Sequence, residues 1–288
     1  MSVTKTFNTS ASDRARRTRR LLSSAMTTIT ALCALCAVTI LLLILGYITI
    51  RGIGAINFQF LIETPKPVGE GGGIGNAILG TFMLIGIGSL FGLPIGIGAG
   101  IYLAEFGDNK YGKLIRFIAD TLTGVPSIII GVFVYTLVVI PMQRFSALAG
   151  SIALGLIMIP IVTRTSEEII RLVPTSLREG ALALGAPQWK VTLGIVLPAA
   201  ATGIATGSML AVARVSGETA PLLFTAFGSR FFNQYLDQPT ASLTAQIYNY
   251  AISPYDEWHR LAWAATLVLM ALILVINISV RFFTRKRY

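Results

Sequence analysis

Two arginines beside long apolar stretches are the residues best suited to chemistry in this sequence. Arg164 directly follows the fourth such stretch, and Arg214 closes the fifth. A guanidinium keeps its charge in a low-dielectric site and offers a planar fork to the oxygens of an oxyanion. Such side chains suit a membrane pathway that stabilises an oxyanion without binding it irreversibly. Glu218 lies four residues after Arg214 and could neutralise it when the pathway is empty.

Each arginine also has a simpler interpretation. Arg214 and Glu218 could form an ordinary ion pair whose long side chains reach the membrane surface. Arg164 precedes the charged residues of segment 167–171 and could belong to a solvated cytoplasmic face. Because an ionisable residue at membrane depth is costly and by default functional, we favour the pathway interpretation for Arg214.

The elements that must position these arginines are membrane helices. Of the 288 residues, 54% are hydrophobic and 12% are charged, whereas about a quarter of residues are charged in soluble domains. The mean hydropathy is +0.72. A helix needs about 20 apolar residues to cross a bilayer. We predict an all-α integral membrane protein with six transmembrane helices, near residues 27–50, 77–103, 117–140, 147–163, 191–213 and 261–280.

The basic residues predict how the chain lies across the membrane. Most of the 23 lysines and arginines fall near the two termini or in alternate loops, at 104–116 and 164–190. The positive-inside rule then places both termini in the cytoplasm, and the net charge of +10 gives no reason to expect nucleic acid. We predict a basic cytoplasmic tail at residues 1–25, lying on membrane lipid headgroups, a six-helix permease domain at 26–283 and a basic cytoplasmic tail at 284–288.

A polar, helix-capable segment interrupts the apolar chain between the fourth and fifth predicted spans. Ser176 and Glu179 have the spacing of a capping box, so a helix should begin at Ser176. Gly185 stands where a left-handed residue would end it. These signals predict a short amphipathic helix at about residues 176–186 on the cytoplasmic side.

The same segment resembles the cytoplasmic coupling motif of ABC-importer permeases. Glu179 is followed six residues later by Gly185 and, ten residues after that, by an Ile-x-Leu-Pro sequence that ends at Pro198. The usual Glu-Ala-Ala opening of that motif reads Glu179, Gly180, Ala181 here, which leaves the spacing intact. The resemblance implies that a separate ATPase is coupled through Glu179, Gly180, Ala181 and Gly185.

Small and acidic residues within the predicted spans have structural interpretations. Asp120, in the first turns of the third span, has no obvious partner in sequence and is predicted to complement a helix N-terminus rather than to relay protons. Pro94 should kink the second span or free a carbonyl. Four glycines recur every fourth residue in that span and predict a close-packing seam: Gly88, Gly92, Gly96 and Gly100.

Motifs for other chemistry are incomplete. Cys33 and Cys36 lie in an apolar stretch without a further ligand nearby, so a redox or zinc site is not favoured. Residues 107–114 nearly match the Walker A spacing, but Leu114 stands at the required Ser or Thr position. No zinc-protease motif or catalytic carboxylate pair is present, which argues against an intramembrane enzyme. We predict a non-catalytic chain that holds no cofactor or metal of its own.

Four further stretches extend the resemblance to most of the chain from about residue 73 onwards. Together with the coupling segment, they resemble the permeases of phosphate ABC importers, above all the PstA type. The stretches are GIGNAILGTF (73–82), PIGIGAGIYLAEF (94–106), GVPSIIIGVF (124–133) and ARVSGETAPLLFTA (213–226). The resemblance implies a MetI-like permease of a bacterial inner membrane, in which Arg164 and Arg214 are associated with the transport of inorganic phosphate.

The resemblance also implies a set of partners. These are a homologous PstC-type permease, a dimer of PstB-type ATPase subunits that bind ATP and Mg, and a periplasmic PstS-type phosphate-binding protein. Two related alternatives stay open: the PstC-type permease itself, and an ABC permease for another oxyanion or small solute. A secondary transporter is an alternative of a different class, although the sequence has no convincing internal repeat.

Overall fold

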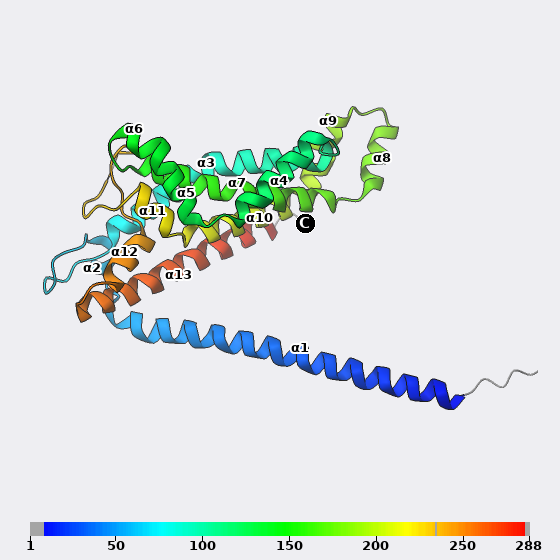
Figure 1. Cartoon of the computed structure of the whole chain (residues 1–288), viewed down its shortest axis with the longest axis horizontal. Coiled ribbons are helices and arrows are strands. Elements are labelled where there is room, and N and C mark those ends of the chain that lie inside the picture. The colour runs from blue at the N-terminus through cyan, green and yellow to red at the C-terminus, as the bar shows by residue number, and fades with distance from the viewer. Residues whose placement is uncertain (1–8, 234, 286–288) are drawn as a thin grey trace, which may run out of the picture. The chain divides into compact units, whose positions relative to one another are not determined.

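The computed structural model describes residues 9–233 and 235–285 of the chain (Figure 1). The chain divides into two compact units, residues 1–50 and residues 51–288. Most of helix α1 (Thr9–Gly52) belongs to the first unit. Within the described residues the only β-structure is a single bridge between Pro65 and Gly72, which confirms the all-α prediction.

Helix α1 begins at Thr9, well before the predicted start near residue 27. Arg, Ala and Leu favour helices, and neither Gly nor Pro occurs between Thr9 and Gly46. Residues 9–25 of the predicted basic tail are therefore helical. Residues 1–8 lie outside the described residues, as do the last three residues of the predicted C-terminal tail.

The second unit holds the remaining helices. Two π-helical turns interrupt it, Tyr135–Val139 between α5 and α6 and Thr192–Val196 between α9 and α10. In chain order the helices are α2 (Phe58–Ile62), α3 (Gly75–Glu105), α4 (Lys110–Gly124), α5 (Ser127–Val134), α6 (Ile140–Met142), α7 (Ala147–Arg171), α8 (Thr175–Ala183), α9 (Gln188–Val191), α10 (Leu197–Ser216), α11 (Ala220–Thr225), α12 (Leu243–Ala251) and α13 (Asp256–Arg285).

The predicted six spans correspond to five helices and one bent pair. The pair Lys110–Gly124 and Ser127–Met142 bends by 103°. Val125 is extended, since a residue before proline is disfavoured in the helical region, and Pro126 follows it. Counted as one span, this pair is the predicted third. The other five are Arg19–Ala55, Gly75–Glu105, Ala147–Arg171, Gln188–Ser216 and Asp256–Ser279.

The predicted glycine seam is confirmed and joins α3 to α7. A Cβ added to Gly96 would lie 2.7 Å from the Cβ of Val162, and one added to Gly100 would lie 2.5 Å from the Cβ of Ser166. Gly88 and Gly92 face α7 in the same way, so the two backbones approach too closely for a side chain. Helix α3 runs through Pro94 as one continuous helix.

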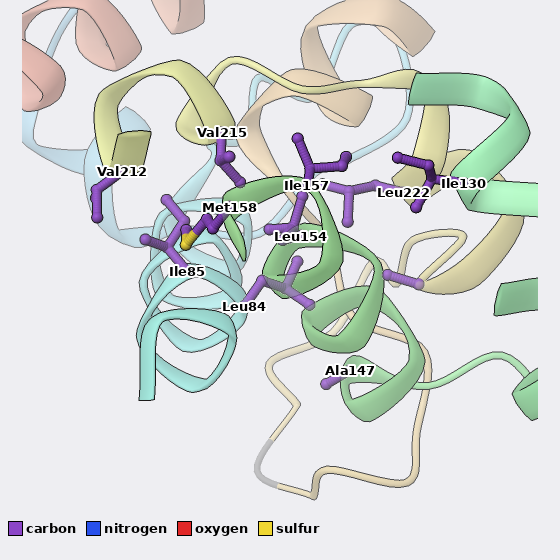
Figure 2. Close-up of a cluster of buried hydrophobic side chains, with 11 residues drawn as sticks. Leu84, Ile85, Ile130, Ala147, Leu154, Ile157, Met158, Val212, Val215 and Leu222 are labelled. Carbon is purple, nitrogen blue, oxygen red and sulfur yellow. The ribbon is translucent and has the colours of Figure 1, made fainter. Parts of the chain in front are cut away.

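A cluster of buried apolar side chains from α3, α5, α7, α10 and α11 forms one core (Figure 2). It brings Val212 and Val215 of α10 together with Ile157 and Met158, in the middle of α7. Further along, Gly207 of α10 lies against Thr165. Because α10 thus runs antiparallel to α7, its last turn lies halfway along α7. We call the end of this unit that carries α8 the α8 end.

Candidate functional site

Helix α8 begins one residue earlier than the capping box predicts. Its N-cap is Pro174, without a side-chain hydrogen bond, and the Pro174 carbonyl accepts from the amide of Leu177 at 3.2 Å. Ser176 therefore lies inside the helix, and the predicted cap by its hydroxyl is wrong. Proline suits the start of a helix because its fixed φ is pre-set for it and the amide it lacks needs no partner there.

The predicted end of α8 at Gly185 is confirmed. Gly185 has a φ of +82°, and its amide donates to the carbonyl of Leu182 at 2.9 Å. The Ala186 amide donates to the carbonyl of Ala181 at 3.2 Å, which completes a Schellman motif. A left-handed φ favours glycine, so this position fixes where the helix stops.

The residues of the coupling motif differ in how exposed they are on α8. Ala181 is buried, whereas Glu179, Gly180 and Gly185 are exposed. Leu184 is 90% exposed, although it is a large apolar side chain. Figure 1 shows α8 set apart from the helices that carry it. Exposed apolar residues on a projecting helix are typical of a surface that binds another protein.

Arg164 lies in an ion-pair network between α4 and α7. Its Nε is 2.9 Å from Oδ1 of Asp120, and its Nη1 is 2.8 Å from Oε2 of Glu167. The prediction that Asp120 complements a helix N-terminus is therefore wrong. Helix α4 starts at Lys110, capped by Asn109, so Asp120 lies far from its first turn and pairs with an arginine remote in sequence.

Glu167 is the centre of this network. Its side chain is only 3% exposed, and three arginines surround it. Besides Arg164, Nε of Arg116 lies 2.7 Å from its Oε1, and Nη2 of Arg171 lies 3.2 Å from the same oxygen. The interpretation of segment 167–171 as a solvated face is wrong for Glu167, because this side chain is buried. Removal of one partner of so deeply buried an ion pair is strongly destabilising.

Arg214 has different surroundings. It lies in the last turn of α10 and is exposed, although it is level with the middle of α7. Seven residues separate it from Gly207, which lies against Thr165, so Arg214 and Arg164 differ in level by roughly 10 Å along α7. Within the described part of the chain, Arg214 forms no ion pair.

Glu218 does not neutralise Arg214 in this structure. Helix α10 ends at Ser216, so the four-residue spacing no longer places both side chains on one helical face. The backbone carbonyl of Glu218 accepts a hydrogen bond from Thr244 Oγ1 at 2.8 Å, which holds this residue against α12. The chain then continues into α11, where Pro221 and Leu222 are buried.

The structure adds a feature that we did not predict. A groove of about 370 Å³ lies between α7 and α10 on the α8 side of Arg214. It is lined by threonines and glycines together with one acidic and two apolar residues: Thr165, Glu168, Ile169, Thr202, Gly203, Thr206, Gly207 and Leu210. The sequence carried a signal for it, since threonine and then glycine repeat four residues apart at 202–203 and 206–207. The groove is open and largely apolar, and the hydroxyls of Thr165 and Thr206 donate to carbonyls of their own helices.

The C-terminal part of α12 contains one titratable group with a shifted pKa, Tyr250. Burial raises the pKa of the Tyr250 phenol above its ordinary value, and its hydrogen bond with Gln246 and the charge of Arg230 oppose that rise. Tyr250 therefore stays protonated at neutral pH.

Comparisons with known proteins place these features in a family. Residues 96–287 match the family model of the binding-protein-dependent transport system inner membrane component. The matched region contains both arginines, α8 and Glu218. The chain belongs to this family. It is accordingly a multi-pass inner membrane protein and a permease subunit of an ABC transporter.

Relatives of this family resemble the chain over most of its length. The phosphate transport system permease protein PstA of Haemophilus influenzae is 45% identical over 82% of this chain and 84% of its own length. The protein of the same name from Yersinia pestis is 46% identical over 83% and 82%. A probable PstA of Methanocaldococcus jannaschii is 39% identical over 73% and 75%.

Solved structures of the family share the fold. A bacterial alginate ABC transporter, in complex with an alginate-bound periplasmic protein, matches 93% of this chain and 96% of its own, with a TM-score of 0.65 and 17% identity. The inward-facing MetNI methionine ABC transporter matches 74% and 93%, with a TM-score of 0.59 and 18% identity. The predicted MetI-like permease fold is thus confirmed.

Proposed function

We propose that this chain is a membrane permease subunit, of the PstA type, in an ATP-driven importer of inorganic phosphate. The observation that carries the proposal is the identity of 45% and 46% with two PstA permeases over more than four fifths of each chain. The chain would form half of the translocation pathway. No specific observation favours the PstC type, another solute or a secondary transporter.

The remaining subunits would supply what this chain lacks. A PstC-type permease would form the other half of the pathway, and a dimer of PstB-type ATPase subunits would bind ATP and Mg. A periplasmic PstS-type protein would deliver phosphate. The exposed apolar residues of α8 support contact with the ATPase. The basic residues near both termini and near α8 support a cytoplasmic position for the two termini and for α8.

The two arginines suggest how phosphate passes. Arg214 is exposed at mid-level and uncompensated, so it would bind the anion with charge-assisted hydrogen bonds. The groove between α7 and α10 would follow towards the α8 end, where Arg164 lies in its ion-pair network with Asp120 and Glu167, closer to the ATPase side. Closure of the ATPase dimer on ATP would displace α8 through Glu179, Gly180, Ala181 and Gly185, and the membrane helices would reorient.

Uptake of radiolabelled phosphate tests this function. It would be measured at micromolar phosphate in a strain that lacks only this gene, with and without the gene restored. We expect uptake to be lost and then recovered. Unchanged uptake in the deletion strain would contradict phosphate as the substrate.

A further inference from the structure

Arg178 points from α8 towards the body of the second unit, unlike its exposed neighbour Glu179. Its Nη2 lies 3.0 Å from Oε1 of Glu105, the last residue of α3, and donates to the carbonyl of Ile170 in α7 at 2.8 Å. The side chain of Glu105 is 6% exposed and that of Arg178 is 21% exposed. One side chain therefore joins α8 to the ends of two long helices.

Glu105 also holds the segment that follows α8. Its Oε2 accepts a hydrogen bond from Oγ1 of Thr192 at 3.2 Å. Thr192 opens the π-helical turn that leads into α10. The carboxylate of Glu105 thus connects α3 both to α8 and to the start of the span that carries Arg214.

The contact between Arg178 and Glu105 is close but not fully hydrogen-bonded. Among the described residues, Nε of Arg178 and Oε1 of Glu105 are both buried without a hydrogen-bond partner, although Nη2 lies 3.0 Å from Oε1. An arginine and a carboxylate can form two parallel hydrogen bonds. In this structure the pair does not form both bonds, so its geometry has room to change when α8 is displaced.

From Glu105 the contacts continue to Arg164. The carbonyl of Leu103, two residues earlier in α3, accepts from Nη2 of Arg116 at 2.8 Å and from Nη2 of Arg171 at 3.4 Å. Both arginines also contact Glu167, which holds Arg164. The end of α3 therefore lies between α8 and the ion-pair network.

We propose that Arg178 and Glu105 are positioning residues that transmit the displacement of α8 to α3 and α7. Within the described residues, this pair is the only ion pair between α8 and the long helices. Displacement of α8 changes the pairing of Arg178 with Glu105, and the glycine seam makes α3 and α7 move together. The inference rests on the proposed function, because α8 is displaced by an ATPase.

The test uses the complete transporter in proteoliposomes, with phosphate imported per ATP hydrolysed as the readout. Arg178→Gln is expected to lower this ratio at least tenfold, while the ATPase subunits still co-purify with the permease. Arg178→Lys keeps a charge that can reach Glu105 and is expected to recover most of the ratio. The matched control is Arg144→Gln, which breaks another arginine–carboxylate contact of 3.0 Å, with Asp237, and is expected to leave the ratio unchanged.

A second variant keeps the test decisive if Arg178→Gln fails to assemble, since that change leaves Glu105 as a buried uncompensated charge. The double variant Arg178→Gln with Glu105→Gln removes both charges and is expected to assemble but to remain uncoupled. A normal ratio in either assembled variant would overturn the inference, as would a ratio for Arg178→Lys as low as that for Arg178→Gln. Failure of the unmodified transporter to import phosphate would instead overturn the proposed function.

Discussion

Arg164 and Arg214 lie on neighbouring antiparallel helices, yet their surroundings differ. Asp120 and Glu167 hold Arg164 at 2.9 and 2.8 Å, whereas Arg214 forms no ion pair within the described residues. The charge of Arg164 is compensated by groups that join α4 to α7. We propose that the charge of Arg214 is available to an anion.

The difference shows which way α10 faces. A charged side chain exposed to lipid at membrane depth is costly, and Arg214 is level with the middle of α7, so the exposed face around it must meet water, an anion or another subunit. The network around Arg164 has no such requirement, because its charges compensate one another. We therefore propose that Arg214 marks the face of α10 that borders the pathway, whereas Arg164 joins α4 to α7 through its ion pairs.

The largest effect that this comparison predicts is at Arg214. Arg214→Gln removes charge-assisted hydrogen bonds worth about 1.5–3 kcal/mol each, so the initial rate of phosphate uptake should fall by about 100-fold. The amount of assembled transporter should not change, since Arg214 has no ion pair to lose. Uptake and co-purification would be measured in parallel with Lys66→Gln, a variant of an exposed cation. Normal uptake by Arg214→Gln would show that Arg214 has no role in transport.

An intermediate effect, of a different kind, is expected at Glu167. Glu167→Gln leaves three arginines without their shared carboxylate, and breaking a buried ion pair costs about 3 kcal/mol or more. The midpoint temperature of unfolding of the purified transporter should fall, with a smaller loss of uptake per folded molecule than for Arg214→Gln. The neighbouring exposed Glu168 provides the control Glu168→Gln. An unchanged midpoint would show that the network does not stabilise the fold.

The smallest effect is expected at Asp120, whose side chain is 57% exposed. Ion pairs at such positions contribute about 0–1 kcal/mol. Asp120→Asn should therefore change uptake by less than about twofold, since Arg164 keeps its contact with Glu167. Uptake that falls as far as for Arg214→Gln would mean that the partners of Arg164, too, take part in transport.

Local signals in the sequence predicted much of the fold. Apolar runs predicted the spans, the spacing of Gly88 to Gly100 predicted the α3–α7 seam, and Gly185 predicted the end of α8. Each of these depends on residues close together in the chain. The start of α8 was wrong because Pro174, rather than Ser176, occupies the N-cap.

The surroundings of the site could not be predicted in the same way. The partner of Asp120 is Arg164, on a different helix, and the burial of Glu167 depends on where α3, α4 and α7 converge. The end of α10 at Ser216 separates Glu218 from Arg214, although their spacing suits a continuous helix. Pairings between distant helices and the ends of spans depend on tertiary packing, which a single sequence does not reveal.

Cysteine accessibility tests the central claim, that Arg214 and not Arg164 faces the anion, most directly. Leu210→Cys, one turn before Arg214 and 66% exposed, and Arg164→Cys would each be made in the complete transporter after Cys33 and Cys36, both exposed, are replaced by serine. We expect a charged methanethiosulfonate reagent to label position 210, phosphate to slow that labelling only while Arg214 is present, and labelling at position 164 to be independent of phosphate. Phosphate protection at 164 but not at 210 would contradict the account.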